Sequence, residues 1–274
     1  MTQSIAPLYD PAHDRDACGV GFIAGRERRP SHGLLRLAVE CLARLDHRGA
    51  KAADGTGDGA GLLTEIPRRL VRRELERVGV DAPEPHRLGL LMAFLPPADP
   101  EAGRRLVADA CAAEDIHLLT WRSVPTNPKV LGDRARATMP VIEQAILALP
   151  PGLSPDEGER LLYLARRAME RAGEAAGLED FAIPSASTRT VVYKGLFTAA
   201  AADRFYWDLN DPAFETSYAI FHQRYSTNTF PAWAIAQPFR VLAHNGEINT
   251  VRSNRAWMRT REVNPTSPAF GDRS

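Results

Sequence analysis

The chain has 274 residues with 34 basic and 34 acidic side chains, so its formal net charge at neutral pH is zero. Apolar residues make up 44% and charged residues 25%, which is typical of globular proteins and excludes disordered or fibrous ones. A nucleic-acid-binding protein normally has a basic excess, and the overall composition shows none.

The first predicted helix begins after Ser31, a good N-cap residue, and ends near residues 46–49. A glycine-rich turn follows at residues 53–61, and a second helix is predicted to begin near Pro67. The apolar residues of the first helix recur at helical spacing: Leu34, Leu35, Ala38, Cys41, Leu42 and Leu45.

In the middle of the chain, residues 88–95 are predicted to form a buried strand and residues 99–115 a helix. Ser154, followed by Pro155 and two acidic residues, predicts the start of a long amphipathic helix. Helices and strands are both frequent, yet no regular βαβ repeat emerges. This pattern favours an α+β fold over a doubly wound parallel sheet.

Beyond residue 185 the pattern changes to short strands, predicted at residues 188–193, 217–222 and 239–243. Residues 247–261 then predict a final helix with Trp257 and Met258 on its apolar side. The last residues are turn-like and provide no closing element. We therefore expect the chain to be a piece of a longer protein.

The sequence shows neither the pattern of a signal peptide nor that of a membrane-spanning helix. The first 17 residues contain acids and two prolines, where a signal peptide requires a basic end and an apolar run. No apolar stretch approaches the roughly 20 residues needed to span a bilayer. We expect a cytoplasmic protein without a membrane anchor.

The glycine-rich turn matches the dinucleotide-binding pattern GxGxxA from Gly55 to Ala60. A dinucleotide site requires a preceding hydrophobic strand and a following helix, and Asp54 and Asp58 would repel a pyrophosphate. The sequence therefore argues against nucleotide binding. Glycines at every second position instead suit a backbone that another segment approaches closely.

The three cysteines are Cys18, Cys41 and Cys111, which are far apart and form no CxxC pair, so a disulfide framework, a zinc site and an iron–sulfur cluster are disfavoured. Cys41 has helical-core spacing and Cys111 lies on a second predicted helix, so both are interpreted as core residues. Cys18 is either a core cysteine of a first strand or a nucleophile. Removal of a leader after Ala17 would give Cys18 a free α-amino group, which could act as the base for its own thiol.

Residues 222–259 form the segment with the highest density of polar, chemistry-bearing side chains. Asn245 and Gly246 follow an apolar run, where an amide side chain and a backbone N–H could point the same way as an oxyanion hole. The alternative is a hairpin turn without a catalytic role. The residues alone leave both interpretations open.

Five motifs, taken in chain order, resemble the class II glutamine amidotransferases, and most closely the glutaminase domains at the start of glutamate synthase large subunits. The resemblance implies an α+β fold of the N-terminal nucleophile hydrolase type, a four-layer αββα sandwich. It covers residues 18–274, with residues 1–17 as a leader removed on processing. The motifs are Cys18–Gly21, Asp46–Ala50, Gly57–Gly61, Arg224–Thr229 and His244–Asn249.

The resemblance also implies residue roles. Cys18 would be the nucleophile that forms a γ-glutamyl thioester and releases ammonia from glutamine. Arg224, assisted by Thr227, would pair with the substrate α-carboxylate, and Arg48 lies where the family keeps an arginine near the nucleophile. Asn245 and Gly246 would supply the oxyanion hole, and no metal is implied.

The resemblance implies partners that this chain does not contain. A full glutamate synthase uses FMN, an iron–sulfur cluster and an NAD(P)H-dependent small subunit, and its ammonia is destined for 2-oxoglutarate. The family's acidic residue for the substrate ammonium lies in a Ser-Asp-Ser stretch that is absent before Ser274, since Asp272 has a different context. The alternatives are a glutamine-binding or regulatory fragment without turnover and, more weakly, a cysteine peptidase.

Overall fold

The computed structural model describes residues 19–223, 231–239, 251–262 and 266–270. Within these ranges, eight strands form two four-stranded sheets of order β1-β8-β2-β7 and β4-β5-β3-β6, and all their pairings are antiparallel. The strands are β1 (Gly19–Ala24), β2 (Ala60–Glu65), β3 (Leu88–Leu95), β4 (His117–Ser123), β5 (Val141–Ala148), β6 (Ala182–Ser187), β7 (Thr190–Gly195) and β8 (Tyr218–Gln223).

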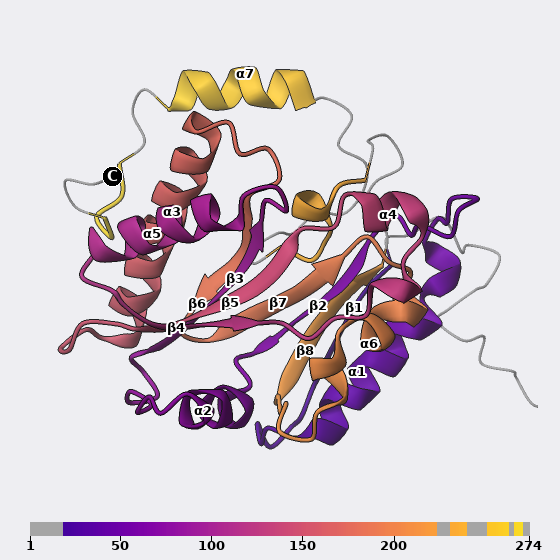
Figure 1. Ribbon diagram of the computed structural model, residues 1–274, viewed down its shortest axis with the longest axis horizontal. Coiled ribbons are helices and arrows are strands. Elements are labelled where there is room, and N and C mark those ends of the chain that lie inside the picture. The colour runs from indigo at the N-terminus through magenta and orange to yellow at the C-terminus, as the bar shows by residue number, and fades with distance from the viewer. Residues whose placement is uncertain (1–18, 224–230, 240–250, 263–265, 271–274) are drawn as a thin grey trace, which may run out of the picture.

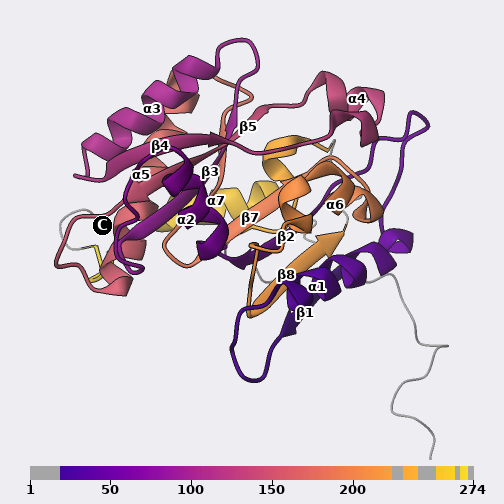
Figure 2. The same ribbon diagram turned by 60° about the horizontal axis from the view of Figure 1, so that its bottom comes forward.

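The helices lie mainly outside the two sheets. In both views α1 lies beside β1 and β8 at one end of the molecule, whereas α3 and α5 lie at the other end, next to the second sheet (Figures 1 and 2). The α-helices are α1 (His32–Arg44), α2 (Arg68–Arg77), α3 (Pro100–Ala112), α4 (Asp133–Ala137), α5 (Pro155–Ala175), α6 (Ala202–Phe205) and α7 (Val251–Arg261). The 3-10 helices are η2 (Asp46–Arg48), η3 (Pro128–Val130), η4 (Ala199–Ala201), η5 (Trp207–Asn210) and η6 (Trp233–Ile235).

Capping residues fix the starts of the two best-predicted helices. The Ser31 hydroxyl accepts a hydrogen bond of 3.2 Å from the Leu34 backbone N–H at the start of α1. At the start of α5, Ser154 and Glu157 form a reciprocal capping box. Such caps stabilise a helix by about 1 kcal/mol each, and both helices begin where the sequence predicts.

The two sheets contribute to two apolar clusters. One cluster joins α1, β2, β8 and the face of β3 that carries Leu90, Met92 and Phe94. The other joins α3 and α5 to the opposite face of the second sheet, including Leu91 and Leu147. Burial of each such side chain stabilises the fold by roughly 1.5–3 kcal/mol. The α+β prediction is confirmed.

Cys41 and Cys111 behave as the core residues that the sequence predicts. Cys111 is buried in α3, and burial raises the pKa of its thiol to about 12. Cys41 is half-buried in α1 and packs against the first cluster. The raised pKa of Cys111 disfavours a reactive thiolate at that position.

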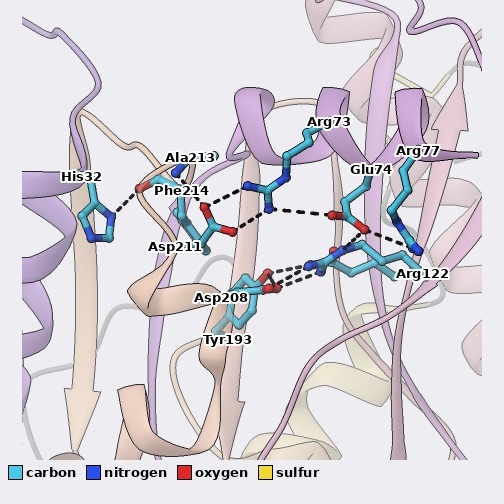
Figure 3. Close-up of polar contacts among 11 residues, drawn as sticks. His32, Arg73, Glu74, Arg77, Arg122, Tyr193, Asp208, Asp211, Ala213 and Phe214 are labelled. Carbon is cyan, nitrogen blue, oxygen red and sulfur yellow. Dashed lines mark hydrogen bonds and ion pairs between the residues drawn. The ribbon is translucent and has the colours of Figure 1, made fainter.

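A buried network of charged and polar groups ties α2 to β4, η5 and β7 (Figure 3). Arg122 donates two hydrogen bonds, of 2.6 and 2.8 Å, to the carboxylate of Asp208. The Tyr193 hydroxyl donates to the same carboxylate at 2.8 Å, and Glu74 approaches Arg122 Nε at 3.5 Å. Burial opposes the charge on Arg122, but the hydrogen bonds with Asp208 outweigh it and raise the pKa of this arginine.

The C-terminal part of the described chain differs from two expectations. Phe239 lies outside any strand, and the rest of the strand predicted at 239–243 falls outside the described residues. Helix α7 is present, but Trp257 and Met258 are exposed rather than packed on an apolar side. Figure 1 shows α7 at the outer edge of the molecule.

Candidate active site

One end of the first sheet brings together chain segments that are far apart in sequence. Gly19 at the start of β1 pairs with Gln223 at the end of β8, and Gln223 also pairs with Ala60 at the start of β2. Cys18 immediately precedes Gly19, and Arg224 immediately follows Gln223. Gly19 and Gln223, which adjoin Cys18 and Arg224 in the chain, are therefore neighbours at this end of the sheet.

Helix η2 brings Arg48 to the same place. A side chain at Gly19 would lie 3.1 Å from Arg48 Cβ, and one at Gly49 would lie only 1.7 Å from Gln223 Nε2. A Cβ atom at residue 49 would therefore displace the buried end of the Gln223 side chain. Arg48 is the one predicted site residue that the structure describes, and it lies beside Gly19 at the start of β1.

Gln223 and Asp58 form the buried polar floor of this region. Gln223 Nε2 donates a hydrogen bond of 3.5 Å to Asp58 Oδ1, and both side chains are buried. Gln223 Oε1 is buried and accepts no hydrogen bond from the described residues. A buried acceptor without a donor costs free energy, so this oxygen is available to a donor beside the start of β1.

The glycine-rich turn allows another backbone segment to pack closely against it and is not a phosphate-binding loop. It leads into strand β2, whereas a dinucleotide site requires a helix at that point. A Cβ atom at Gly57 would lie 2.4 Å from the backbone carbon of Phe197, so the expected close approach is confirmed. Asp54 accepts hydrogen bonds from the backbone N–H groups of Arg134 and Thr56, which lower the pKa of its carboxyl to about 2.

Residues 231–239, here called the strap, wrap around the edge strand β7. On one face of the sheet the Trp233 ring lies so close to Gly195 that a Cβ atom there would be 2.4 Å from it. On the other face the backbone oxygen of Gln237 would lie 2.8 Å from a Cβ atom at Gly61. Gly61 and Gly195 belong to opposite faces because Gly61 pairs with Lys194, the neighbour of Gly195.

The strap is anchored in the first apolar cluster. The Trp233 ring lies 6.0 Å from the Phe94 ring and 5.7 Å from the Phe205 ring, and its Nε1 donates to the Ala135 carbonyl at 3.2 Å. The two polar segments that the sequence singles out, residues 224–229 and 244–249, flank the strap on either side.

The remaining predicted site residues lie outside the described residues: Cys18, Arg224, Thr227, Asn245 and Gly246. Gln223 and Lys194 are buried polar residues that the sequence did not predict as part of this region. Lys194 did leave a signal, since it is one of only three lysines and interrupts the apolar run of β7. Gln223 lies in the polar segment 222–259 that the sequence singles out, but it was not assigned a role there.

The described ranges contain neither a candidate metal cluster nor a candidate membrane-spanning helix. No group of three or more histidine, cysteine, aspartate or glutamate side chains there could hold a metal ion. Within the same ranges, none of the helices is both long and apolar enough to cross a membrane.

The chain was compared with known families and proteins. The family model for class-II glutamine amidotransferases matches residues 18–274. The large chain of NADPH glutamate synthase from Azospirillum brasilense is 44% identical over 270 residues, which cover 97% of this chain and 18% of the relative. Ferredoxin-dependent glutamate synthase 2 from Synechocystis is 43% identical over 252 residues, or 91% of this chain and 16% of the relative. The Bacillus subtilis NADPH enzyme's large chain is 40% identical, over 97% of this chain and 18% of its own.

Proposed function

Because this chain belongs to the class II glutamine amidotransferases, we propose that it hydrolyses glutamine to glutamate and ammonia. Cys18 is the nucleophile, exposed when residues 1–17 are removed. Its thiolate attacks the side-chain carbonyl carbon of glutamine, the tetrahedral intermediate expels ammonia, and water hydrolyses the γ-glutamyl thioester. The α-amino group of Cys18 takes the thiol proton and returns it to the leaving group.

The other proposed residues bind substrate or stabilise charge. Arg224 pairs with the α-carboxylate of glutamine, a charge-assisted contact of about 1.5–3 kcal/mol, and Thr227 assists it. Arg48 lies near the nucleophile and supports the same subsite. The Asn245 side chain and the Gly246 backbone N–H donate hydrogen bonds to the oxyanion, and loss of one such donor costs about 100- to 1000-fold in rate.

The strand pairing at the end of the first sheet is the single observation that carries this proposal. Gly19 pairs with Gln223, so the residues that adjoin Cys18 and Arg224 are neighbours across two strands. Arg48 packs against the same glycine. A nucleophile and a carboxylate-binding arginine attached to these points would be within reach of one small amino acid.

The chain spans less than a fifth of the length of the curated relatives that it matches, with shares between 16% and 18%. We propose that it is the amidotransferase domain of a cytoplasmic glutamate synthase large subunit. Its ammonia then aminates 2-oxoglutarate in synthase domains that hold FMN and an iron–sulfur cluster, supplied with electrons by a small subunit. The described thiols do not fit a cluster, since Cys41 and Cys111 lie on separate helices.

A four-layer αββα sandwich is also part of the proposal. The structure supplies two sheets with helices beside each, but one face of β1 and β8 is uncovered. Val20, Phe22 and Ile220 are exposed there, Phe22 to 79%. Monomeric proteins rarely expose contiguous apolar patches of this kind, which supports a further covering layer in the longer protein.

A second candidate function rests on one feature of the sequence. Residues 1–274 contain no Ser-Asp-Ser stretch of the kind that carries the family's acidic partner for the substrate ammonium. The chain alone would then bind glutamine without turning it over.

Intact-mass analysis and a glutaminase assay test the primary proposal. We expect the purified protein to have lost residues 1–17 and to release ammonia from glutamine, and Cys18→Ala to lower the rate to background. Cys41→Ala is the matched control, since Cys41 is a half-buried helix residue and its loss leaves the rate unchanged. Equal rates for wild type and Cys18→Ala, with glutamine still bound, would favour the second candidate. A retained leader would contradict the nucleophile assignment.

A further inference from the structure

A pocket of about 520 Å³, here called the α5 pocket, lies between α5, β6, β7 and the strap. Its volume falls within the range of roughly 300–1,000 Å³ that is usual for small-molecule sites. The apolar part of its wall includes Phe181, Ile183, Pro184 and Phe239. Its charged residues are Arg166, Glu170 and Lys194. None of these residues takes part in the proposed hydrolysis of glutamine.

Lys194 provides a buried ammonium group in the α5 pocket. The residue is only 1% exposed, and none of the described acidic side chains forms an ion pair with it. Its Nζ donates a hydrogen bond of 2.8 Å to the Ala234 carbonyl oxygen and lies 4.6 Å from the centroid of the Phe239 ring. An ammonium group has three N–H donors, so this one carbonyl leaves part of its donor capacity unused within the described chain.

Arg166 provides a second cation whose donors lack acceptors. Its guanidinium lies over the Tyr163 ring, 5.6 Å from the centroid, and its side chain is 20% exposed. It donates no hydrogen bond to any described residue, and its Nε atom is buried without an acceptor. Glu170 approaches it only to 3.6 Å and also pairs with Arg167. Because a buried donor without an acceptor costs free energy, an acceptor placed in the pocket would stabilise this guanidinium.

The charges of the α5 pocket fit one negative charge. Two cations and the Glu170 carboxylate leave a net charge of one positive unit on the lining. The two cations also repel each other, since burial, followed by the charge of Arg166, lowers the pKa of Lys194 to about 7. A carboxylate has a single charge and accepts strong hydrogen bonds from guanidinium and ammonium groups. A phosphate dianion would exceed the positive charge and be repelled by Glu170.

We propose that the α5 pocket binds a small organic carboxylate with an apolar or aromatic body. The carboxylate accepts hydrogen bonds from Arg166 and Lys194. The body packs against the apolar wall that Phe181, Ile183 and Pro184 provide. This binding site is separate from glutamine hydrolysis, so it stands or falls independently of the function proposed above.

Titration calorimetry with 3-phenylpropionate, which has one carboxylate and one ring, tests the proposal at about pH 6, where Lys194 carries its charge. We expect saturable binding of one molecule per chain. The neutral amide 3-phenylpropionamide should bind at least about tenfold more weakly. Lys194→Met and Arg166→Gln should each weaken binding of the acid by about tenfold or more, because each removes a charge-assisted hydrogen bond.

Arg171→Gln and Lys129→Met are the matched controls, since each removes an exposed cation that does not line the pocket. Both should leave the affinity unchanged. Circular dichroism and the unfolding midpoint check that every variant folds, and Arg166→Gln with the acid–amide comparison decides the matter if Lys194→Met does not.

Three results would overturn the proposal: equal affinity for acid and amide, unchanged affinity in folded Arg166→Gln, or no saturable binding at about 10 mM probe. Tighter binding of inorganic phosphate than of 3-phenylpropionate would contradict the carboxylate class.

Discussion

At the scale of single residues, the protein buries two cations in opposite ways. Arg122 is 6% exposed and forms a two-hydrogen-bond pair with Asp208, so its charge is matched by a carboxylate. Lys194 is more deeply buried and donates to a neutral carbonyl. Burial, followed by the nearby charge of Arg166, lowers the pKa of Lys194 from 10.5, its ordinary value, to about 7.

This depressed pKa makes the stability of the protein depend on pH in a defined direction. Between the folded pKa of about 7 and the unfolded value of 10.5, the unfolded chain binds more protons than the folded one, so stability rises with pH. Below about pH 7 both states hold the proton and the cost of the buried charge is complete. Relative to Lys194→Met, we expect the unfolding free energy of wild type to increase by up to about 1.4 kcal/mol per pH unit in this window.

Urea unfolding of both proteins between pH values of about 6 and 9 measures this effect. Other titrating groups cancel in the difference between wild type and Lys194→Met, which leaves the contribution of Lys194. A difference that is constant across this range would show that the amine keeps an ordinary pKa.

At the scale of elements, the Arg122 network joins parts of the chain that share little other contact. It links β4 through Arg122, β7 through Tyr193, η5 through Asp208 and α2 through Glu74 (Figure 3). Burial, followed by the charge of Asp208, raises the pKa of Tyr193 well above its ordinary value, so the phenol remains a donor. The network therefore holds β4 of one sheet and β7 of the other in fixed positions relative to η5 and α2.

Asp208→Asn should be strongly destabilising, because it leaves the buried Arg122 charge without its carboxylate. Removal of one partner from a buried ion pair costs about 3–5 kcal/mol. Glu40→Gln is the control, since Glu40 pairs with Arg44 on the exposed surface of α1, where such pairs contribute less than about 1 kcal/mol. Denaturant unfolding of both variants checks the contrast, and similar losses for the two would contradict the role of the network.

The elements that could be predicted from sequence are those with a local signal. Ser31 and Ser154 mark helix starts by caps, and β3 is a continuous apolar run, so all three have nearly the predicted bounds. Strands β4, β5 and β6 were not predicted, because β4 and β6 carry polar residues that pair only across the sheet. Arg122 is an example, since it is buried against Asp208, which is 86 residues away in sequence.

The sequence identified the motifs of the candidate site, but it did not show which of their residues lie next to one another in space. The glycine spacing at Gly57 and Gly61 indicated a close approach, yet nothing in the sequence identified Phe197 and Gln237 as the approaching groups. Pairing between Gly19 and Gln223 likewise depends on the whole fold. Lys194 escaped prediction because its partners are a backbone carbonyl and a ring, which carry no sequence pattern.

At the scale of the whole molecule, the uncovered face of β1 and β8 is the main unpartnered surface among the described strands. Val20, Phe22 and Ile220 lie on it, and β1 is also the edge strand of its sheet. An exposed apolar edge promotes association between chains. The isolated chain should therefore associate more readily than a longer protein in which this face is covered.

Phe22→Thr tests this expectation, because threonine is β-branched and suits a strand, while the substitution removes the most exposed side chain of the face. We expect sedimentation velocity to show less association for Phe22→Thr than for wild type at the same concentration. Leu37→Gln removes an exposed apolar residue of α1 that lies outside the face and should leave association unchanged. Equal association of wild type and Phe22→Thr would show that the face does not drive it.

The pairing of β1 with β8 also bears on when, during synthesis, the leader before Cys18 could be removed. Strand β1 is among the first segments to be synthesised, yet its neighbour in the described sheet ends at Gln223, near the other end of the chain. Contacts between such distant segments form late in folding. If Cys18 is the nucleophile and removal of the leader before it requires the assembled sheet, a nascent chain would carry that residue in blocked form until translation has passed β8. The topology would thereby delay ammonia release until most of this domain has been made.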